Sequence, residues 1–562
     1  MQTFPVKVLI VLSILQSSIF NSFGQLLGEK VKYTHADTLR GSNGPGRQNW
    51  DVQYYEITVK PDYIAKTIEG KNIITYADSG VFIMQLDMQE PMIIDSIVSE
   101  DQHYTFTREG NVYWVTVRDP KTKEFIKIKP AISSMTVYFH GKPREAILPP
   151  WDGGWIWKKD KNGNPWMSVA CQGLGASVWY PCKDIQSDEP NNGAILHIIV
   201  PDSLVAVGNG RLKEQHAMPG GNTMYTWEVK SAINNYCIIP YIGKYVHFGE
   251  IYKGIKGDLD MDYWVLDYDL EKAKKQFTDA PRMMKAFEYW FGPYPFYKDG
   301  YKLVESPHLG MEHQSAIAYG NGFQNGYRNG STSWSGTKWE QMSDYIIVHE
   351  SGHEWFANNI TSNDLADMWI HESFTSYSEV LFAEYYFGKE AGIEYSIGTR
   401  KDILNRNPII GPYGVNADGD LDLYFKGANM IHLIRQVVNS DKKFRGILIG
   451  LNKTFYHQTV STAQVENYIS EKSGFDFSKI FDQYLRTTDI PVLEYKIENK
   501  TISYRWDSAV AKFNLPVKVS FGKKEQWLKP TAEWQTINPG SWYDGNAFMV
   551  NKNFYIRVRK SA

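Results

Sequence analysis

The hydrophobic and polar positions divide the chain into stretches with different periods. Between about Gly41 and Gly249, short runs rich in β-branched and aromatic residues are separated by Gly, Pro, Asp and Asn, which is the pattern of β-strands. The clearest runs are Tyr54–Lys60, Lys71–Tyr76, Val81–Leu86, Ser134–His140 and Ala194–Val200. Because no helical pattern separates them, this stretch predicts an antiparallel sandwich or saddle, interrupted by a loop at Leu148–Met167.

A helical pattern follows and returns several times before strands resume near the C-terminus. Apolar residues recur every three or four positions in the stretches Leu270–Phe291, Met368–Tyr386 and Asp418–Val438. The chain is therefore predicted to be a multidomain α+β protein. Its predicted parts are an N-terminal antiparallel β domain at residues 25–250, an α+β domain at 251–490 and a small C-terminal β-sandwich at 491–562.

Residues 1–24 have the pattern of a signal peptide. Lys7 precedes a short apolar run, and the small residues Ser22 and Gly24 stand before a cut ahead of Gln25. An uncleaved anchor is the alternative, but the apolar run is shorter than the ~20 residues that a spanning helix needs. No later segment reaches that length, so we expect an exported protein, periplasmic or secreted, whose mature chain is not inserted into a membrane.

Composition narrows the function classes only a little. The net charge of −3 favours neither nucleic acid nor an anionic membrane surface as a partner. The composition does not indicate the oligomeric state. The three cysteines, Cys171, Cys182 and Cys237, are consistent with one disulfide and one free thiol, or equally with three buried free thiols.

The stretch from His349 to Glu379 carries the strongest chemical signal. His349, Glu350 and His353 form the pattern HExxH, and Glu372 follows with eighteen residues between it and His353. On a helix, residues four positions apart differ by only about 40° around the axis, so both imidazoles face one side. Two neutral imidazoles and one carboxylate leave the fourth position of one tetrahedral Zn²⁺ open for water, the arrangement of catalytic zinc sites.

The residues around the motif are consistent with a buried helix. Ser343 can cap it, and apolar residues recur at helical spacing as far as Phe356. Two core histidines without a metal are the alternative. Glu379, seven residues after Glu372 on the same helix face, is predicted to accept the second ring N–H of a ligand histidine, with an ordinary helix salt bridge as its alternative.

Three further segments extend the pattern beyond the motif. They are GMEHQ at 310–314, Tyr424 in YFKGA, and CQGLGASVWYPCKD at Cys171–Asp184. Together with HESGH and Glu372, they resemble the aminopeptidase N and leukotriene hydrolase family of gluzincin zinc peptidases. The resemblance covers almost the whole exported chain and implies that the α+β domain is a thermolysin-like catalytic domain.

The resemblance also implies a role for each matched residue. His349, His353 and Glu372 would hold the zinc ion, and Glu350 would be the general base for the zinc-activated water. Tyr424 would donate its hydroxyl to the oxyanion.

A second group of matched residues would bind the peptide. Glu312 and Gln172 would bind the free α-ammonium group of a peptide substrate. Gly310 and Met311 would pair with its backbone as an added strand.

The chain departs from the family's pattern at four positions. The first glycine of GxMEN is Leu309 and the asparagine is His313; His371 and Ser373 stand where the family often has asparagine and glycine. These departures leave Glu312, the residue that would anchor the α-ammonium group, in place and alter the pocket around it. A metal-binding role for either histidine is the alternative, although the three-residue ligand set is complete without them.

The sequence therefore predicts a zinc aminopeptidase that hydrolyses the N-terminal residue of peptides with a free N-terminus. An endopeptidase or an epoxide hydrolase that uses the same zinc site is the alternative. A binding protein that kept the fold without catalysis is a third hypothesis, and the complete set of metal-binding and proton-transfer residues argues against it.

Overall fold

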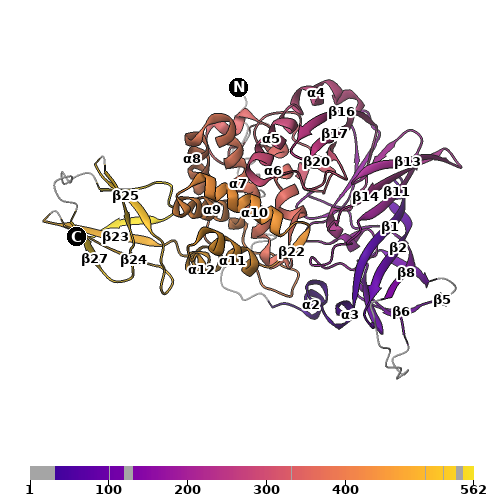
Figure 1. Cartoon of the computed structure of the whole chain (residues 1–562). Helices are drawn as coiled ribbons and strands as arrows, with labels where there is room; N and C mark the ends of the chain where they lie inside the picture. Colours follow the sequence, from indigo (N-terminus) through magenta and orange to yellow (C-terminus); the bar gives the residue numbers. More distant parts are fainter. Residues whose placement is uncertain are drawn as a thin grey trace, which may run out of the picture.

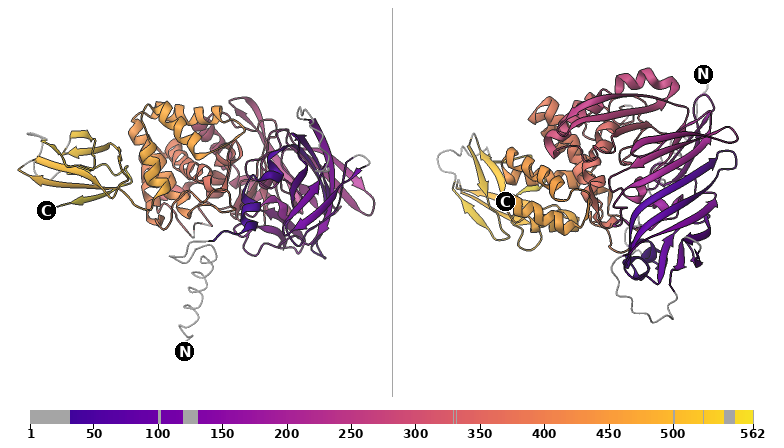
Figure 2. Two further views of the ribbon diagram at one scale, coloured as in Figure 1. Left: turned by 90° about the horizontal axis from the view of Figure 1, so that it is seen from below. Right: turned by 45° about the vertical axis from the view of Figure 1, so that its right-hand side comes forward.

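The computed structural model describes residues 32–99, 102–118, 131–328, 330, 332–499, 501–522, 524–538 and 548–561. The predicted signal peptide at residues 1–24 lies outside them. A β-rich part is followed by a part that contains most of the helices and then by a second, smaller β part (Figure 1). The two β parts lie on opposite sides of the helices (Figure 2). The multidomain α+β class is confirmed, while the domain limits stay a prediction.

The largest sheet has eight strands in the order β13-β14-β11-β1-β2-β8-β4-β5. Its strands are β1 (Trp50–Asp62), β2 (Thr67–Asp78), β4 (Ile93–Ser99), β5 (Gln102–His103), β8 (Ala131–Gly141), β11 (Ala194–Pro201), β13 (Arg211–Met218) and β14 (Asn222–Val229). Buried and partly exposed residues alternate along β11, as expected for a sheet with one face on the core. Neighbouring strands are antiparallel except β1 and β11, which pair in parallel. The alternation of hydrophobic and polar residues alone cannot distinguish a parallel from an antiparallel strand pair.

Two smaller sheets complete the β-rich part, in the orders β12-β15-β10-β9 and β3-β7-β6. Their strands are β3 (Ile83–Asp87), β6 (Thr105–Glu109), β7 (Val112–Thr116), β9 (Gly154–Lys159), β10 (Pro165–Ala170), β12 (Val205–Val207) and β15 (Tyr241–Gly243). The loop predicted at Leu148–Met167 was wrong, because β9 and β10 form a hairpin there. Its turn is closed by Asp160, whose Oδ1 accepts the N–H groups of Asn162 and Asn164. The hairpin leads directly towards Gln172.

A five-stranded sheet connects the β-rich part to the helices, in the order β16-β17-β18-β20-β19. Its strands are β16 (Tyr245–Gly254), β17 (Gly257–Leu266), β18 (Tyr301–Glu305), β19 (Gly310–Met311) and β20 (Ile317–Tyr319). β17, β18 and β20 pair in parallel, whereas the outer strands β16 and β19 are antiparallel to their neighbours. The short strand β19 is therefore an edge strand of this sheet.

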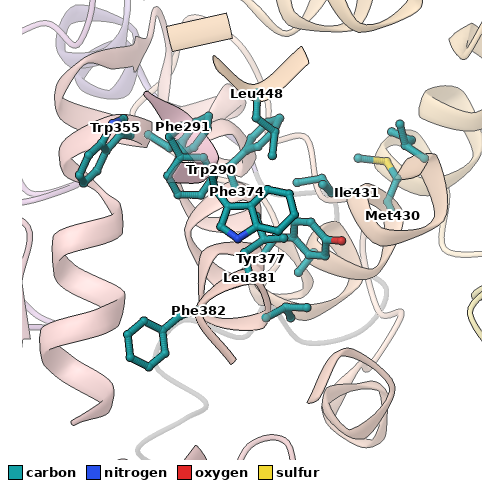
Figure 3. Packing of buried hydrophobic residues seen from close by; sticks show 14 of the residues in the cluster. Trp290, Phe291, Trp355, Phe374, Tyr377, Leu381, Phe382, Met430, Ile431 and Leu448 are labelled. Atoms are coloured by element: carbon teal, nitrogen blue, oxygen red, sulfur yellow. The ribbon is translucent and has the colours of Figure 1, made fainter. Parts of the chain in front are cut away.

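The helical part is built around α7 (Trp369–Phe387), which is buried on all sides from Trp369 to Ala383. The other helices of this part are α4 (Leu270–Gln276), α5 (Asp279–Phe291), α6 (Tyr345–Gly352), α8 (Lys389–Gly398), α9 (Phe425–Val438), α10 (Asp441–Thr454), α11 (Thr462–Ser473) and α12 (Ser478–Arg486). It also contains the paired short strands β21 (Ile360–Ser362) and β22 (Gln458–Val460). The two short helices α2 (His35–Gly41) and α3 (Pro45–Gln48) precede β1. Phe374, Tyr377 and Leu381 of α7 pack with Trp290 and Ile431 (Figure 3). A helix buried all round must supply partners for every polar group it carries.

The C-terminal part has two sheets, in the orders β27-β24-β23-β29 and β26-β25-β28. Their strands are β23 (Val492–Glu498), β24 (Thr501–Asp507), β25 (Val517–Phe521), β26 (Lys524–Leu528), β27 (Gln535–Ile537), β28 (Phe548–Val550) and β29 (Arg557–Lys560). Leu493, Ile502 and Val517 from both sheets are buried in the common core, as in a sandwich. Among the helices of the described ranges, none is long and apolar enough to cross a membrane.

Candidate active site

Helix α6, which carries His349 and Glu350, is fixed at its start by Asp344. The Asp344 carboxylate accepts the N–H groups of Ile346 and Ile347, so Asp344 caps the helix and the predicted cap, Ser343, was wrong by one residue. The same carboxylate accepts a hydrogen bond of 2.6 Å from the hydroxyl of Tyr319 in β20. The helix is therefore held against the five-stranded sheet at the end opposite to the histidines.

The HExxH motif occupies the last turn of α6. The helix ends at Gly352, and His353 directly follows it with φ −64° and ψ −19°, which are still helical values. His353 thus stays one turn beyond His349, on the same side. The predicted helix was too long, because the backbone leaves helical geometry at Phe356 and Ala357.

The imidazoles of His349 and His353 face the carboxylate of Glu372 from α7. His349 Nε2 lies 3.7 Å and His353 Nε2 lies 3.4 Å from Glu372 Oε2. One ligand atom of each residue lies within 4.8 Å of the other two, and all three side chains are buried. The structure brings together the three residues predicted to hold the metal.

Each histidine is held through its other ring nitrogen. His349 Nδ1 lies 2.7 Å from Glu379 Oε1, and His353 Nδ1 lies 3.1 Å from the main-chain oxygen of Phe356 and 3.0 Å from Thr375 Oγ1. Carbonyl and carboxylate oxygens only accept hydrogen bonds, so both Nδ1 atoms carry the hydrogen. Both Nε2 atoms then present lone pairs towards Glu372.

These donors fit one zinc ion. Glu372 Oε2 is buried and has no hydrogen-bond donor among the residues that the structure describes. A buried carboxylate oxygen that faces two imidazole lone pairs needs a cation, and two histidines with one carboxylate are a ligand set of catalytic zinc.

We expect Glu379→Gln to weaken zinc binding about tenfold to a hundredfold, because an amide polarises the His349 ring less than a carboxylate does. Competition with a chromogenic chelator measures the affinity. The control is Tyr395→Phe, which removes only the 2.7 Å hydrogen bond that the Tyr395 hydroxyl donates to the other oxygen of Glu379. Equal zinc affinity in Glu379→Gln and wild type would show that this contact does not tune the metal site.

Glu350 lies beside the metal ligands and is buried. One of its carboxylate oxygens lies within 4.8 Å of a ring nitrogen of His353 and of a carboxylate oxygen of Glu312. Burial, assisted by the neighbouring charges of Glu312 and Glu372, raises the pKa of Glu350 to about 7. The carboxylate has room only because residue 310 is glycine, since a Cβ on Gly310 would lie 2.4 Å from Glu350 Oε1.

Glu312 is a further buried carboxylate next to this group, with 2% of its surface exposed. Its Oε1 accepts hydrogen bonds from the side-chain amide of Gln172 and, at 2.9 Å, from the hydroxyl of Tyr236. Its main-chain oxygen accepts a hydrogen bond of 2.8 Å from Asn358 Nδ2. The β-rich part and the helical part thus both hold Glu312, and the predicted pair Glu312 and Gln172 is in contact.

Gly310 and Met311 form the edge strand β19, which leads into Glu312. β19 pairs with β20 and is the last strand in the order of its sheet. An edge strand has main-chain N–H and C=O groups that can pair with an added extended chain. The predicted peptide-binding role of this segment is therefore compatible with its place in the sheet.

Tyr424 lies against the metal ligands at the start of α9. It follows the short 3₁₀ turn Leu421–Leu423, so it precedes the helix in which the sequence pattern had placed it. Its ring centroid lies 6.1 Å from that of His349, with the rings nearly parallel. Burial and the charge of Glu372 raise the pKa of Tyr424 well above its ordinary value, so the hydroxyl keeps its proton and can donate it in a hydrogen bond.

The two unusual histidines have structural contacts. His313 Nδ1 meets the hydroxyl of Tyr241, and His371 Nε2 accepts the main-chain N–H of Ser362 at 2.8 Å. Neither belongs to a group of metal-capable side chains within the described part of the chain. Their contacts favour packing and backbone support over the metal role that was the alternative.

The other two departures from the family pattern, Ser373 and Leu309, also have structural contacts. The Ser373 hydroxyl donates a hydrogen bond of 2.6 Å to the main-chain oxygen of Leu423, directly before Tyr424. This close approach requires glycine at 427, because a Cβ on Gly427 would lie 1.8 Å from Ser373 Oγ. Leu309 packs against the hydrophobic core of the helical part.

Sequence reasoning missed three side chains that support the site: Thr375, Tyr236 and Asn358. Thr375 stands three residues after Glu372, so helical spacing could have placed it on the same face. Tyr236 and Asn358 bind Glu312 from 76 and 46 residues away in the sequence. No local pattern signals such contacts.

The three cysteines are buried free thiols. Burial raises the pKa of each thiol well above its ordinary value, so they stay uncharged. The structure therefore agrees with the second of the two alternatives, three buried thiols without a disulfide.

Part of the chain matches a known family model. Residues 276–484 match the model described as "Peptidase family M1 domain". Tricorn protease-interacting factor F2 of Thermoplasma volcanium is 23% identical over 386 residues, which are 65% of this chain and 45% of that protein. Probable aminopeptidase 2 of Sulfurisphaera tokodaii is 23% identical over 453 residues, which are 75% of this chain and 54% of that protein. The chain spans about half the length of these relatives.

Solved structures share the fold over most of the chain. A mutant M1 zinc metallopeptidase from Deinococcus radiodurans, bound to a Tyr-Ser-Ala substrate, has a TM-score of 0.64 at 20% identity and covers 78% of this chain and 95% of its own. A two-domain M1 zinc metallopeptidase mutant bound to L-tryptophan has a TM-score of 0.63 at 20% identity, with 76% and 92% covered. Residues 276–484 of the chain thus match the peptidase family M1 domain, and most of the chain shares its fold with M1 zinc metallopeptidases.

Proposed function

We propose that the chain is a zinc aminopeptidase that removes the N-terminal residue from peptides with a free N-terminus. The position of Glu312 carries the proposal, because this buried carboxylate lies within 4.8 Å of Glu350 and His353 atoms and is not part of the group His349, His353 and Glu372. Such a charge can bind a cation of the substrate, and every unblocked peptide has an α-ammonium group at its N-terminus. An anchor at that group limits cleavage to the first peptide bond.

Proton transfer is assigned to Glu350. Zinc, when bound by His349, His353 and Glu372, supplies a Lewis acid that acidifies water and polarises a carbonyl group. The Glu350 carboxylate takes a proton from the attacking water and delivers it to the leaving amine. Burial raises the pKa of Glu350 above the ordinary value of a glutamate, which favours its acting as a proton acceptor.

The other side chains position the substrate. The Tyr424 hydroxyl donates a hydrogen bond to the carbonyl oxygen as negative charge develops there. The main chain of Gly310 and Met311 pairs with the extended peptide, and Gln172 contacts its N-terminal end. An endopeptidase or an epoxide hydrolase would leave the Glu312 anchor without a purpose, which is why the aminopeptidase reading is preferred.

The test is hydrolysis of a panel of aminoacyl p-nitroanilides, each beside its N-acetylated counterpart. We expect cleavage of free amines only, loss of activity on dialysis against a chelator, and recovery with one zinc ion per chain. Equal cleavage of acetylated substrates would replace the aminopeptidase by an endopeptidase. No cleavage by protein that binds zinc would reject this substrate class.

We also propose that the chain is exported to the periplasm or secreted, with cleavage ahead of Gln25. The support is the pattern of residues 1–24, which lie outside the described residues. N-terminal sequencing of the chain from the exported fraction is expected to begin at Gln25. An intact N-terminus in the membrane fraction would favour the uncleaved anchor instead.

A further inference from the structure

Tyr236 reaches the site from the β-rich part and has no place in the mechanism proposed above. It lies in the 3₁₀ turn Asn235–Cys237, with 4% of its surface exposed. Its hydroxyl donates a hydrogen bond of 2.9 Å to Glu312 Oε1. A buried tyrosine hydroxyl needs a hydrogen-bond partner. Burial of a charged carboxylate costs free energy, so packing alone does not explain why the partner here is the carboxylate beside the metal site.

Two donors meet the same carboxylate oxygen. The side-chain amide of Gln172 also donates to Glu312 Oε1. No side chain of the described ranges donates to the other oxygen, Oε2. The carboxylate is thus oriented by one oxygen, and the second is left for a ligand.

The orientation of Gln172 follows from the same contact. Because its NH₂ group points to the carboxylate, its amide oxygen is the part that remains to accept a hydrogen bond. An α-ammonium group has three N–H donors, and Glu312 Oε2 and the Gln172 oxygen are two acceptors of the kind that it needs.

The main chain of Glu312 is held separately from its side chain. Asn358 Nδ2 donates to the Glu312 carbonyl oxygen at 2.8 Å, and Cys237 Sγ lies 3.8 Å from the same oxygen. Asn358 is itself bonded to the Glu354 carboxylate at 3.0 Å. Loss of the Tyr236 hydroxyl would therefore leave the backbone of the anchor in place and change only the direction of its carboxylate.

We propose that Tyr236 is a positioning residue for the N-terminal ammonium group of the substrate. Its hydroxyl occupies Glu312 Oε1 together with Gln172 and so presents Oε2 to the substrate. This inference rests on the proposed aminopeptidase function and adds Tyr236 as the residue that orients the Glu312 carboxylate. Tyr236 touches Glu312 and not the reacting atoms, so it acts on substrate binding.

The experiment uses Tyr236→Phe, which removes one oxygen atom and keeps the ring. For aminoacyl p-nitroanilides we expect KM to rise about tenfold, as for a lost hydrogen bond to a charged group, with kcat within about twofold. Inhibition is measured with leucine hydroxamate and with 4-methylpentanohydroxamic acid, which lacks only the amino group. The amino compound should bind about tenfold more weakly to the variant, and the des-amino compound should bind equally to both proteins.

The matched control is Tyr180→Phe. Tyr180 is fully buried in the same part, and its hydroxyl donates to the main-chain oxygen of Asn235, the residue before Tyr236, at 3.0 Å. This variant perturbs the same turn without touching Glu312. We expect it to keep the wild-type ratio of the two inhibition constants.

The outcomes separate the inference from the function on which it rests. A wild-type protein that binds both hydroxamates equally has no ammonium site, and the proposed function fails with the inference. A wild type that prefers the amino compound, with the preference unchanged in Tyr236→Phe, keeps the function and overturns the inference. Equal weakening of both compounds in Tyr236→Phe would also overturn it, because a structural role would not depend on the amino group.

Discussion

Replacing Glu350 with glutamine is expected to lower kcat for aminoacyl p-nitroanilides about a thousandfold, within the range for loss of a general base. Glutamine has nearly the same size, and the space next to Gly310 accommodates either side chain. The amide cannot take the proton of the attacking water, so the chemical step loses its proton carrier. KM should change little, because Glu350 is not among the residues assigned to the peptide or its ammonium group.

Two measurements make this expectation specific to proton transfer. Elemental analysis should find one zinc ion per chain in Glu350→Gln, since the ligand set His349, His353 and Glu372 is intact. Glu354→Gln is the matched control, because Glu354 is buried too, with its pKa raised by burial to about 7. Its carboxylate is bonded to Tyr294 and Asn358, so it reaches the anchor only through the main chain of Glu312 and does not touch the metal ligands. A comparable loss of kcat in both variants would mean that removing any buried charge of this segment disables the enzyme.

The metal site was predictable because its information is local. His349 and His353 are fixed relative to each other by one helical turn, and Glu372 lies on the next helix along the chain. Helical geometry alone therefore places the two imidazoles on one side. The spacing to Glu372 and the second contact of His349 with Glu379 follow from the same pair of helices, and the structure has both.

Errors occurred where two local patterns compete. Ser343 and Asp344 are both good caps, and the tertiary hydrogen bonds that the Asp344 carboxylate accepts from Tyr319, Asn321 and Gln276 favour Asp344. The segment Leu148–Met167 is rich in turn-forming residues, but its aromatic residues pair across a hairpin and pack in the core, as Trp155 does. The local composition predicts the turn. It does not predict the strands on both sides of the turn, because these depend on burial of their side chains in the tertiary structure.

The ammonium anchor shows the limit of sequence reasoning most clearly. The resemblance supplied Glu312 and Gln172, but their surroundings come from a turn at Asn235–Cys237 and from Asn358 beyond the zinc helix. Contacts between such distant segments depend on how the β-rich part sits on the helices. A periodicity or a short motif does not contain that information.

Replacing Glu312 with glutamine is expected to lower kcat/KM for substrates with a free α-amino group about a hundredfold, as for loss of one partner of a buried charge pair. The amide still offers an oxygen to the ammonium group but no charge to balance it. N-acetylated substrates do not use the anchor, so their slow background rate should not fall. Zinc content should stay at one ion per chain.

The control and the contradicting result follow from how close Glu312 lies to the metal ligands. Glu305→Gln changes another buried carboxyl of the same sheet, whose pKa burial raises to about 8, so it is largely neutral already and its replacement should leave kcat/KM unchanged. One oxygen of Glu312 lies within 4.8 Å of Glu350 and His353 atoms, so its charge also acts on the metal site. If that were its main effect, Glu312→Gln would change the rates on free and acetylated substrates by the same factor. Only a loss confined to free amines assigns Glu312 to the substrate's N-terminus.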